Sequence, residues 1–198
     1  MRVTMVSGSY PPMEDGVGDY TSRFFHELSR QVGRENVSVI TTALTDPVEH
    51  DPRIHYAIDR WNTRGTLRLT RLLRAQRPDV ISVQYQTVGY GRDLGITFFP
   101  WLARLALPGT PVVATVHEFT SRTPKGRARV LASLAACTRA IVVNHNYVDE
   151  IGALLPTHRD RLVHVPIGSN VTAHPVSAAR VRALREELPI LIASLDDQ

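Results

Sequence analysis

Short apolar runs alternate with amphipathic segments along this chain, and the alternation constrains its fold more than any other feature. The apolar runs fall at 2–7, 37–42, 54–57, 79–84, 111–116, 139–143 and 162–165, and the helical segments between them at 16–32, 65–76, 93–107, 125–137 and 146–155. The run at 111–116 is apolar at almost every position, as in strands that are buried on both faces. The order predicts an α/β fold, a Rossmann-like doubly wound parallel sheet with helices on both faces.

The length and composition fit one domain with a full core. The chain has 198 residues, 43% of them hydrophobic, which is enough for one ordinary domain and hardly for two. After residue 165 the pattern changes to a turn, a linker and an Arg/Glu-rich segment. We therefore expect a domain at 1–170, followed at 171–198 by a linker and the start of a C-terminal domain that is missing.

Charge and cysteine content limit the partners and the compartment. The net charge of +4 is mild, so it favours anionic substrates or a membrane surface slightly and does not argue for nucleic acid. The single cysteine, Cys137, excludes an intrachain disulfide framework and a thiolate metal site. The N-terminal residues do not match a signal peptide, and the longest apolar stretch, 94–107, is too short to span a membrane. We expect a cytoplasmic protein.

The loop at 8–19 joins the first apolar run to the first helical segment. Its two consecutive prolines lack the N–H donor that a strand needs, so the chain leaves the sheet there. Asp15 is a predicted helix N-cap, and Gly16 and Gly18 leave the first helical turn without side-chain bulk. Such a helix start suits a phosphate or a sugar hydroxyl. The alternative is that the glycines only let the helix pack closely on the sheet.

Polar residues follow each apolar run. They are Ser7 to Asp19, Thr41-Thr42, Gln84-Tyr85-Gln86, His117-Glu118, Asn144-His145-Asn146 and Gly168-Ser169-Asn170. Because ligands of open α/β sheets bind outside the carboxyl ends of the strands, we expect these residues to converge on one rim. The rim is rich in hydrogen-bonding groups and holds no paired-histidine or cysteine metal set, so it suits a sugar or polyol.

Each rim residue has a simpler interpretation. His117 either acts on a ligand or is a rim histidine whose hydrogen bonds are all made within the protein. Glu118 either binds a ligand or is a solvated carboxylate or a helix cap. For Asn144 we favour a capping role at the following helix. Ser7, Gln84 and Tyr85 are alternatively plain strand ends.

The sequence also contains two groups of basic residues, of which the second lies nearer the predicted cleft. Arg64, Arg68, Arg71, Arg74 and Arg77 recur at helical spacing. We favour a solvated face for them, and the alternative is contact with anionic lipid head groups at the inner face of a membrane. Arg122, Lys125, Arg127 and Arg129 follow the His117 loop. A solvated helix start is favoured there over contact with a phosphate of the donor or acceptor.

Several of these motifs occur together in an order that resembles a known family. They are Tyr10-Pro11-Pro12, Asp15 to Thr21, Gln84-Tyr85-Gln86, Thr115-Val116-His117-Glu118 and Val165 to Asn170. In combination they resemble the N-terminal half of GT-B fold glycosyltransferases of family 4, over about residues 1–175. The resemblance implies two Rossmann-like domains around a cleft, with the acceptor in the N-terminal domain and most of the nucleotide-sugar donor in the C-terminal domain. It also implies transfer with retention and no metal.

The resemblance assigns roles by position. His117 is the implied catalytic residue, beside the transferred sugar and the acceptor. The helix start formed by Asp15, Gly16, Val17 and Gly18 would approach the donor diphosphate or the reacting sugar. Tyr85, Gln86, Glu118 and Asn144 join them as donor- or acceptor-binding residues, and Gly168, Ser169 and Asn170 mark the hinge.

The sequence departs from the family pattern in two respects. Where many members have paired glycines in the first loop, position 15 is Asp, which brings a negative charge near any phosphate unless its carboxylate caps the helix. We also expect the C-terminal domain of the family pattern, with the two glutamates seven residues apart that the family uses on the donor, to be missing from this sequence.

The sequence therefore predicts the acceptor-binding domain of a retaining glycosyltransferase of carbohydrate biosynthesis. It would transfer a sugar from a nucleotide-sugar to a hydroxyl acceptor, with no cofactor and no nucleic acid, and would be inactive without a C-terminal domain or subunit. A noncatalytic subunit that stabilises or activates a separate glycosyltransferase is the alternative. A nicotinamide-dependent oxidoreductase is disfavoured because Gly8 does not begin a G-x-G-x-x-G fingerprint.

Overall fold

The computed structural model describes residues 1–45, 51–87, 89–91, 93–119, 123–168 and 177–187. The chain divides into two compact units, Met1–Ile167 and Gly168–Gln198. The first unit contains the sheet and the helices that cover it. The second unit contains the described helix α6 (Ala178–Glu187). No helix among the described residues is long and apolar enough to cross a membrane.

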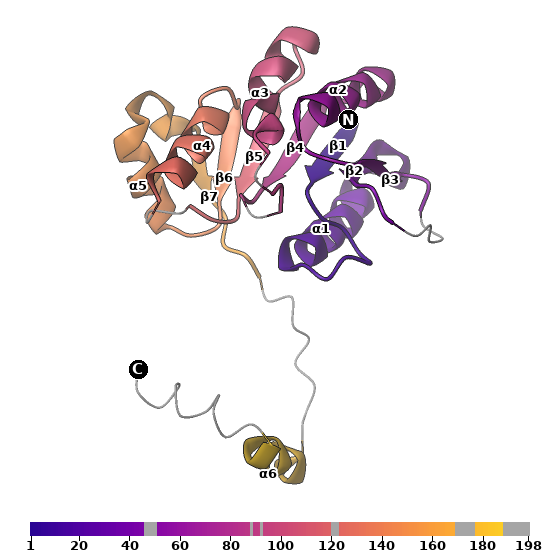
Figure 1. Cartoon of the computed structure of the whole chain (residues 1–198), viewed down its shortest axis with the longest axis vertical. Helices are drawn as coiled ribbons and strands as arrows, with labels where there is room; N and C mark the ends of the chain where they lie inside the picture. Colours follow the sequence, from indigo (N-terminus) through magenta and orange to yellow (C-terminus); the bar gives the residue numbers. More distant parts are fainter. Residues whose placement is uncertain (46–50, 88, 92, 120–122, 169–176, 188–198) are drawn as a thin grey trace. The chain divides into compact units, whose positions relative to one another are not determined.

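The first unit is built on one sheet of seven strands (Figure 1). The strands are β1 (Val3–Ser7), β2 (Val37–Thr42), β3 (Ile54–Ile58), β4 (Val80–Tyr85), β5 (Val112–Val116), β6 (Arg139–Val142) and β7 (Leu162–His164). They pair in the order β3-β2-β1-β4-β5-β6-β7, and every neighbouring pair is parallel. The predicted Rossmann-like α/β fold is confirmed.

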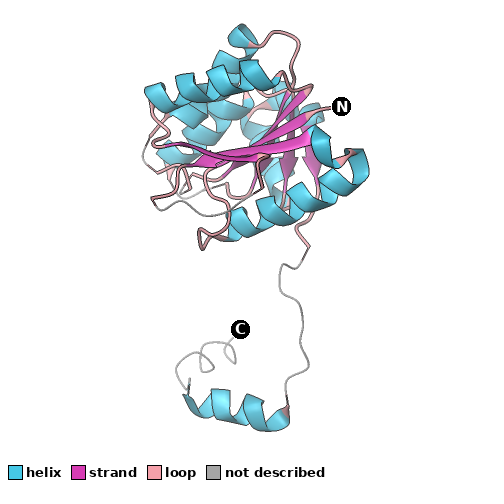
Figure 2. Cartoon of the chain, turned by 90° about the vertical axis from the view of Figure 1, so that its right-hand side faces the viewer, coloured by secondary structure: helices cyan, strands magenta, loops and turns pink. Residues whose placement is uncertain are grey.

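Helices cover the two faces of the sheet unequally. They are α1 (Gly16–Val32), α2 (Thr63–Gln76), α3 (Gly95–Ala106), α4 (Pro124–Leu134) and α5 (Asn146–Leu154), with short 3₁₀ turns η1 (Arg34–Asn36) and η2 (Pro156–Arg161). Helix α1 packs on one face, where Phe25 meets Met5 and Val39. Helices α2 to α5 share the other face with a larger core (Figure 2). Side chains that alternate along β1 and β4 serve both cores.

Most predicted elements lie within three residues of those observed. Helix α4 ends at Leu134 instead of 137, because the chain there tightens into turns in which the N–H groups of Ala136 and Cys137 bond to the carbonyls of Ser133 and Leu134. Strand β4 runs one residue further than predicted, to Tyr85.

Candidate active site

The strand order reverses between β1 and β4, which is the switch point at which open α/β sheets bind ligands. The loops that follow these strands touch there. A Cβ atom at Gly8 would lie 2.5 Å from the carbonyl oxygen of Gly89, so the close approach depends on the missing side chain. Thr42, at the end of β2, donates a hydrogen bond to the carbonyl of Gly8. Three loops therefore form one continuous rim.

Helix α1 begins at this rim with the predicted cap. The Asp15 carboxylate accepts hydrogen bonds from the Gly18 N–H, at 3.0 Å, and from the Ser9 hydroxyl. Gly18 packs so closely on the Ser9-Tyr10 backbone that a Cβ would lie 3.3 Å from the Tyr10 nitrogen, whereas a Cβ at Gly16 would meet no atom within 4 Å. Packing thus accounts for Gly18, and Gly16 leaves an open helix start.

Val17 lies between these glycines and is buried. The N–H groups of Gly16 and Val17, in the first turn of α1, have no partner within the helix because helical hydrogen bonding begins later. The exposed backbone of Gly16 therefore gives a ligand access to the positive end of the helix.

His117 follows β5 and is held by neighbours from two other elements. Its Nε2 lies 3.0 Å from the Oε1 of Gln84, and its ring packs edge-on against Tyr20 of α1, with 4.8 Å between ring centroids. The Gln84 amide nitrogen donates to the Ser82 hydroxyl at 3.1 Å, so Gln84 Oε1 accepts a hydrogen bond from the N–H at His117 Nε2. This arrangement leaves the Nδ1 of His117 with a lone pair.

Burial keeps His117 neutral. Desolvation lowers the pKa of its imidazole from 6.5 to about 4, against the opposite pull of the Asp15 and Glu118 charges. At neutral pH the ring is therefore a hydrogen-bonding group and carries no charge.

Glu118 connects the loop after β5 to the loop after β4 by hydrogen bonds. Its Oε1 accepts hydrogen bonds from the Thr87 N–H, at 2.9 Å, and from the Thr87 hydroxyl. Gln86, on the same loop as Thr87, has a buried Oε1 with no hydrogen-bond partner among the described residues. The loop after β4 thus holds a buried acceptor without a partner in the described part of the chain, one residue before the Thr87 that Glu118 binds.

The remaining predicted site residues are not part of this group. The Tyr85 side chain points into the core, where its hydroxyl lies 3.1 Å from that of Thr97, and burial raises its pKa. Asn144 accepts the Asn146 N–H at 3.0 Å, a local bond to the first residue of α5, whereas the N-cap position of that helix is His145 and makes no side-chain cap hydrogen bond. A Cβ at Gly168 would meet no atom within 4 Å, and Ser169 and Asn170 lie outside the described residues.

The site includes three more residues to which the sequence patterns assign no binding role, namely Gln84, Tyr20 and Thr87. Strand alternation was the available signal for Gln84, because it places Gln84 on the opposite face of β4 from Tyr85. Tyr20 lies four residues after Gly16 and hence on the same side of α1. Thr87 carries no pattern that distinguishes it from other loop residues.

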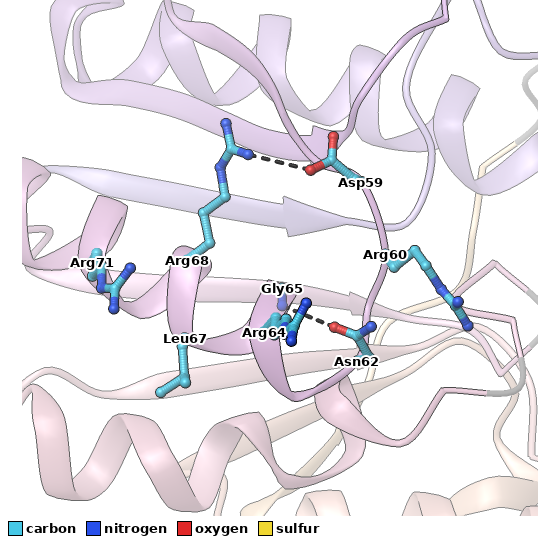
Figure 3. Close-up of a pocket in the computed structure, with 8 residues that line it drawn as sticks. All are labelled: Asp59, Arg60, Asn62, Arg64, Gly65, Leu67, Arg68 and Arg71. Atoms are coloured by element: carbon cyan, nitrogen blue, oxygen red, sulfur yellow. Dashed lines mark hydrogen bonds and ion pairs between the residues drawn. The ribbon is translucent and has the colours of Figure 1, made fainter.

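The arginines predicted on one helix face do not share one environment. A hollow of about 620 Å³ on the flank of α2 is lined by Arg60, Arg64, Arg68 and Arg71 (Figure 3) and by none of the rim residues predicted to bind ligands. Arg74 donates instead to the Ala106 carbonyl at 3.0 Å, and Arg77 caps the end of α2.

The second basic group is also divided. Arg129 donates to the Asp93 carbonyl at 2.8 Å and to the Thr97 hydroxyl at 3.4 Å, and so supports the start of α3. Arg122 lies outside the described residues.

The fold is that of a Rossmann-like domain, with a candidate ligand site at the switch point of its sheet. The family model described as Glycosyltransferase Family 4 matches residues 21–172. The chain belongs to this family.

Other comparisons add little. No curated protein matched the sequence. A crystal structure of TubZ from Clostridium botulinum phage c-st is similar over 92% of this chain and 64% of that chain, with 12% identity and a TM-score of 0.43. This chain therefore spans less than two thirds of that protein.

Proposed function

We propose that this domain binds the hydroxyl acceptor in a retaining sugar transfer from a nucleotide-sugar, and that a second domain or subunit holds most of the donor. The observation that carries the proposal is the neutral His117, fixed by Gln84 at 3.0 Å next to the open start of α1. Neutral side chains with a free lone pair suit sugar hydroxyls. The family membership of residues 21–172 supports the same reaction class.

We assign different roles to the neutral and the positively polarised groups of the site. The lone pair on His117 Nδ1 would accept a hydrogen bond from a hydroxyl of the sugar or the acceptor and so orient that hydroxyl. The first-turn N–H groups of Gly16 and Val17 would stabilise the negative charge that develops on the leaving diphosphate. The Asp15 carboxylate is already bonded to Gly18 and Ser9, which reduces its repulsion of a phosphate.

We propose that the transfer uses no metal and belongs to carbohydrate biosynthesis on the cytoplasmic side. The two carboxylates near His117, those of Asp15 and Glu118, each accept two hydrogen bonds. Among the described residues, no three His, Cys, Asp or Glu side chains are grouped as metal ligands.

Calorimetric and thermal-shift titrations with UDP-, GDP- and dTDP-sugars test the division of labour. The chain should bind donor only after a candidate C-terminal partner has been added. Tight donor binding by the chain alone would overturn the proposed division.

The reconstituted enzyme tests His117. His117→Ala should lower turnover by about 10²–10³-fold, the range for losing one oriented polar group in a transition state, with little change in Tm. His26→Ala, at an exposed position of α1, is the matched control. Unchanged turnover in His117→Ala would support a noncatalytic subunit instead.

A further inference from the structure

Helix α3 has a second apolar face, which the described residues of the first unit leave partly exposed. Its inner face is buried through Ile96, Phe99 and Ala103. On its outer face Phe98 is 54% exposed and Leu105 is 83% exposed. Arg104 is the one charged residue of α3. Because so apolar a helix surface is normally covered, the outer face of α3 is a candidate docking surface.

The apolar surface extends from α3 to α2. A groove of about 550 Å³ between the two helices is lined by four apolar side chains, Leu67, Leu94, Phe98 and Leu102, and by Gly95 and the polar residues Asn62, Thr63, Thr66 and Asp93. In Figure 3, Leu67 points to the side of α2 opposite to Arg68. Trp101 continues the surface on the far side of α3. It is 45% exposed, and its indole N–H already donates to the Ala132 carbonyl at 2.7 Å, so burying the ring would leave no donor unpaired.

The helices around this surface are exclusively basic in their charged residues. Helix α3 packs against both α2 and α4. The three helices carry eight basic residues and no acidic residue, namely Arg64, Arg68, Arg71, Arg74, Arg104, Lys125, Arg127 and Arg129. Two acidic residues lie beside these helices, and they pair with Arg68 and Arg60: Asp59 at 3.3 Å and Asp93 at 3.5 Å. Arg74 and Arg129 donate to backbone carbonyls. Among the described residues, Arg64 and Arg71 are the arginines of α2 for which neither an ion pair nor such a bond is found, so they carry the positive charge of this surface.

We infer that this face docks onto an anionic lipid bilayer. The basic–apolar face, defined as Leu67, Leu94, Phe98, Trp101 and Leu105 with Arg64 and Arg71, would place its apolar side chains at the acyl boundary. The two arginines would contact lipid phosphates. Apolar and aromatic side chains beside arginines are the pattern of peripheral membrane surfaces. The inference goes beyond the sugar transfer and does not depend on it.

Charge distinguishes a bilayer from the other occupants. A second copy docked by two-fold symmetry would bring this face against itself and oppose its arginines to each other. A nucleic acid would match the arginines but would leave the alkyl side chains of Leu94 and Leu105 in water. An anionic bilayer matches both the charge and the apolar surface.

Vesicle flotation of the full chain tests the inference. The protein should float with vesicles that contain phosphatidylglycerol and not with pure phosphatidylcholine, and the binding should weaken with salt. Phe98→Ser/Leu105→Ser and Arg64→Glu/Arg71→Glu should each reduce partitioning by about tenfold or more. The matched controls are Leu154→Ser, an exposed leucine of α5, and Arg30→Glu, an exposed arginine of α1 on the other face of the sheet. Both should bind as the wild type does.

Fluorescence of the unmodified protein gives an independent readout. Of the two tryptophans, Trp61 is buried and Trp101 is exposed, so brominated lipids should quench Trp101, and Trp101→Phe should abolish the quenching. Absence of quenching in the wild type would overturn the inference even if a variant misfolds. Two other results without vesicle binding would also overturn the inference. One is a dimer that Leu105→Glu dissociates, and the other is oligonucleotide binding that Phe98→Ser/Leu105→Ser leaves unchanged.

Discussion

The protonation state and the orientation of His117 have separate structural causes. Burial keeps the imidazole neutral, and the chain of hydrogen bonds through Gln84 to Ser82 fixes which nitrogen carries the proton. A histidine on an exposed loop would have neither property. The side chain is therefore prepared as an acceptor before any ligand arrives, which reduces the cost of orienting it.

This environment makes stability depend on pH. The folded-state pKa of His117 is about 4, against 6.5 for an ordinary histidine, so between these values the unfolded chain binds a proton that the folded chain does not. The contribution of the neutral ring to the free energy of unfolding is therefore fully present above about pH 6.5 and is lost as the pH falls toward 4. The slope is at most about 1.4 kcal/mol per pH unit. In His117→Asn this part of the slope should disappear.

Urea unfolding of both proteins across this pH range measures the effect. The difference in unfolding free energy between wild type and His117→Asn should change with pH. Parallel curves would show that the ring is not held neutral in the folded state.

Some of these residues were predictable from the sequence and some were not. The cap at Asp15 and the position of His117 after an apolar run follow from local patterns. The role of Gln84 does not, because the direction of a side chain at the end of a strand depends on which face its neighbours cover. The sequence placed Gln84, Tyr85 and Gln86 together on the rim, and the structure turns Tyr85 into the core.

At the scale of elements, loops and helix ends approach each other where side chains are absent. Gly8 brings the loops after β1 and β4 into contact. At the start of α3, a Cβ at Gly95 would overlap with Thr66 of α2 and with the Trp61 carbonyl. Helix limits were predictable from periodicity. The differing environments of Arg68, Arg74 and Arg77 were not, because the elements that pack around α2 determine them.

Two glycines in the same loop give a matched comparison. Gly8→Ala would place a Cβ 2.5 Å from the Gly89 carbonyl oxygen and should lower the unfolding free energy by about 1–3 kcal/mol, as overpacking does. Gly16→Ala faces open space and should stay within about 0.5 kcal/mol of the wild type. Denaturant midpoints measure both, and an equal loss in the two variants would contradict the contact between the loops.

At the scale of the first unit, two cores lie on opposite faces of one sheet. Strand β1 contributes Met5 to the smaller core beneath α1 and Val6 to the larger core beneath α2 to α5. Because the same backbone supports both, neither core can be lost without disturbing the other. The sequence predicted the parallel sheet but not the order of its strands, since adjacency depends on contacts far apart along the chain.

We therefore expect one cooperative unfolding transition. Phe25→Ala in the smaller core and Phe99→Ala in the larger core, both fully buried, should each lower stability by about 3–5 kcal/mol. Far-UV circular dichroism and the fluorescence of Trp61, a member of the larger core, should report the same midpoint. If Phe25→Ala melts earlier by circular dichroism than by fluorescence, the cores are independent.

The central position of β1 has a consequence for synthesis. Of the seven strands, β1 is made first, yet its pairing with β4 runs from Val3–Val80 to Ser7–Gln84. One edge of its backbone must stay unpaired until β4 has left the ribosome. During that interval a buried apolar strand is open to wrong partners, so the nascent chain should depend on chaperones more than a chain whose strands pair in the order in which they are made.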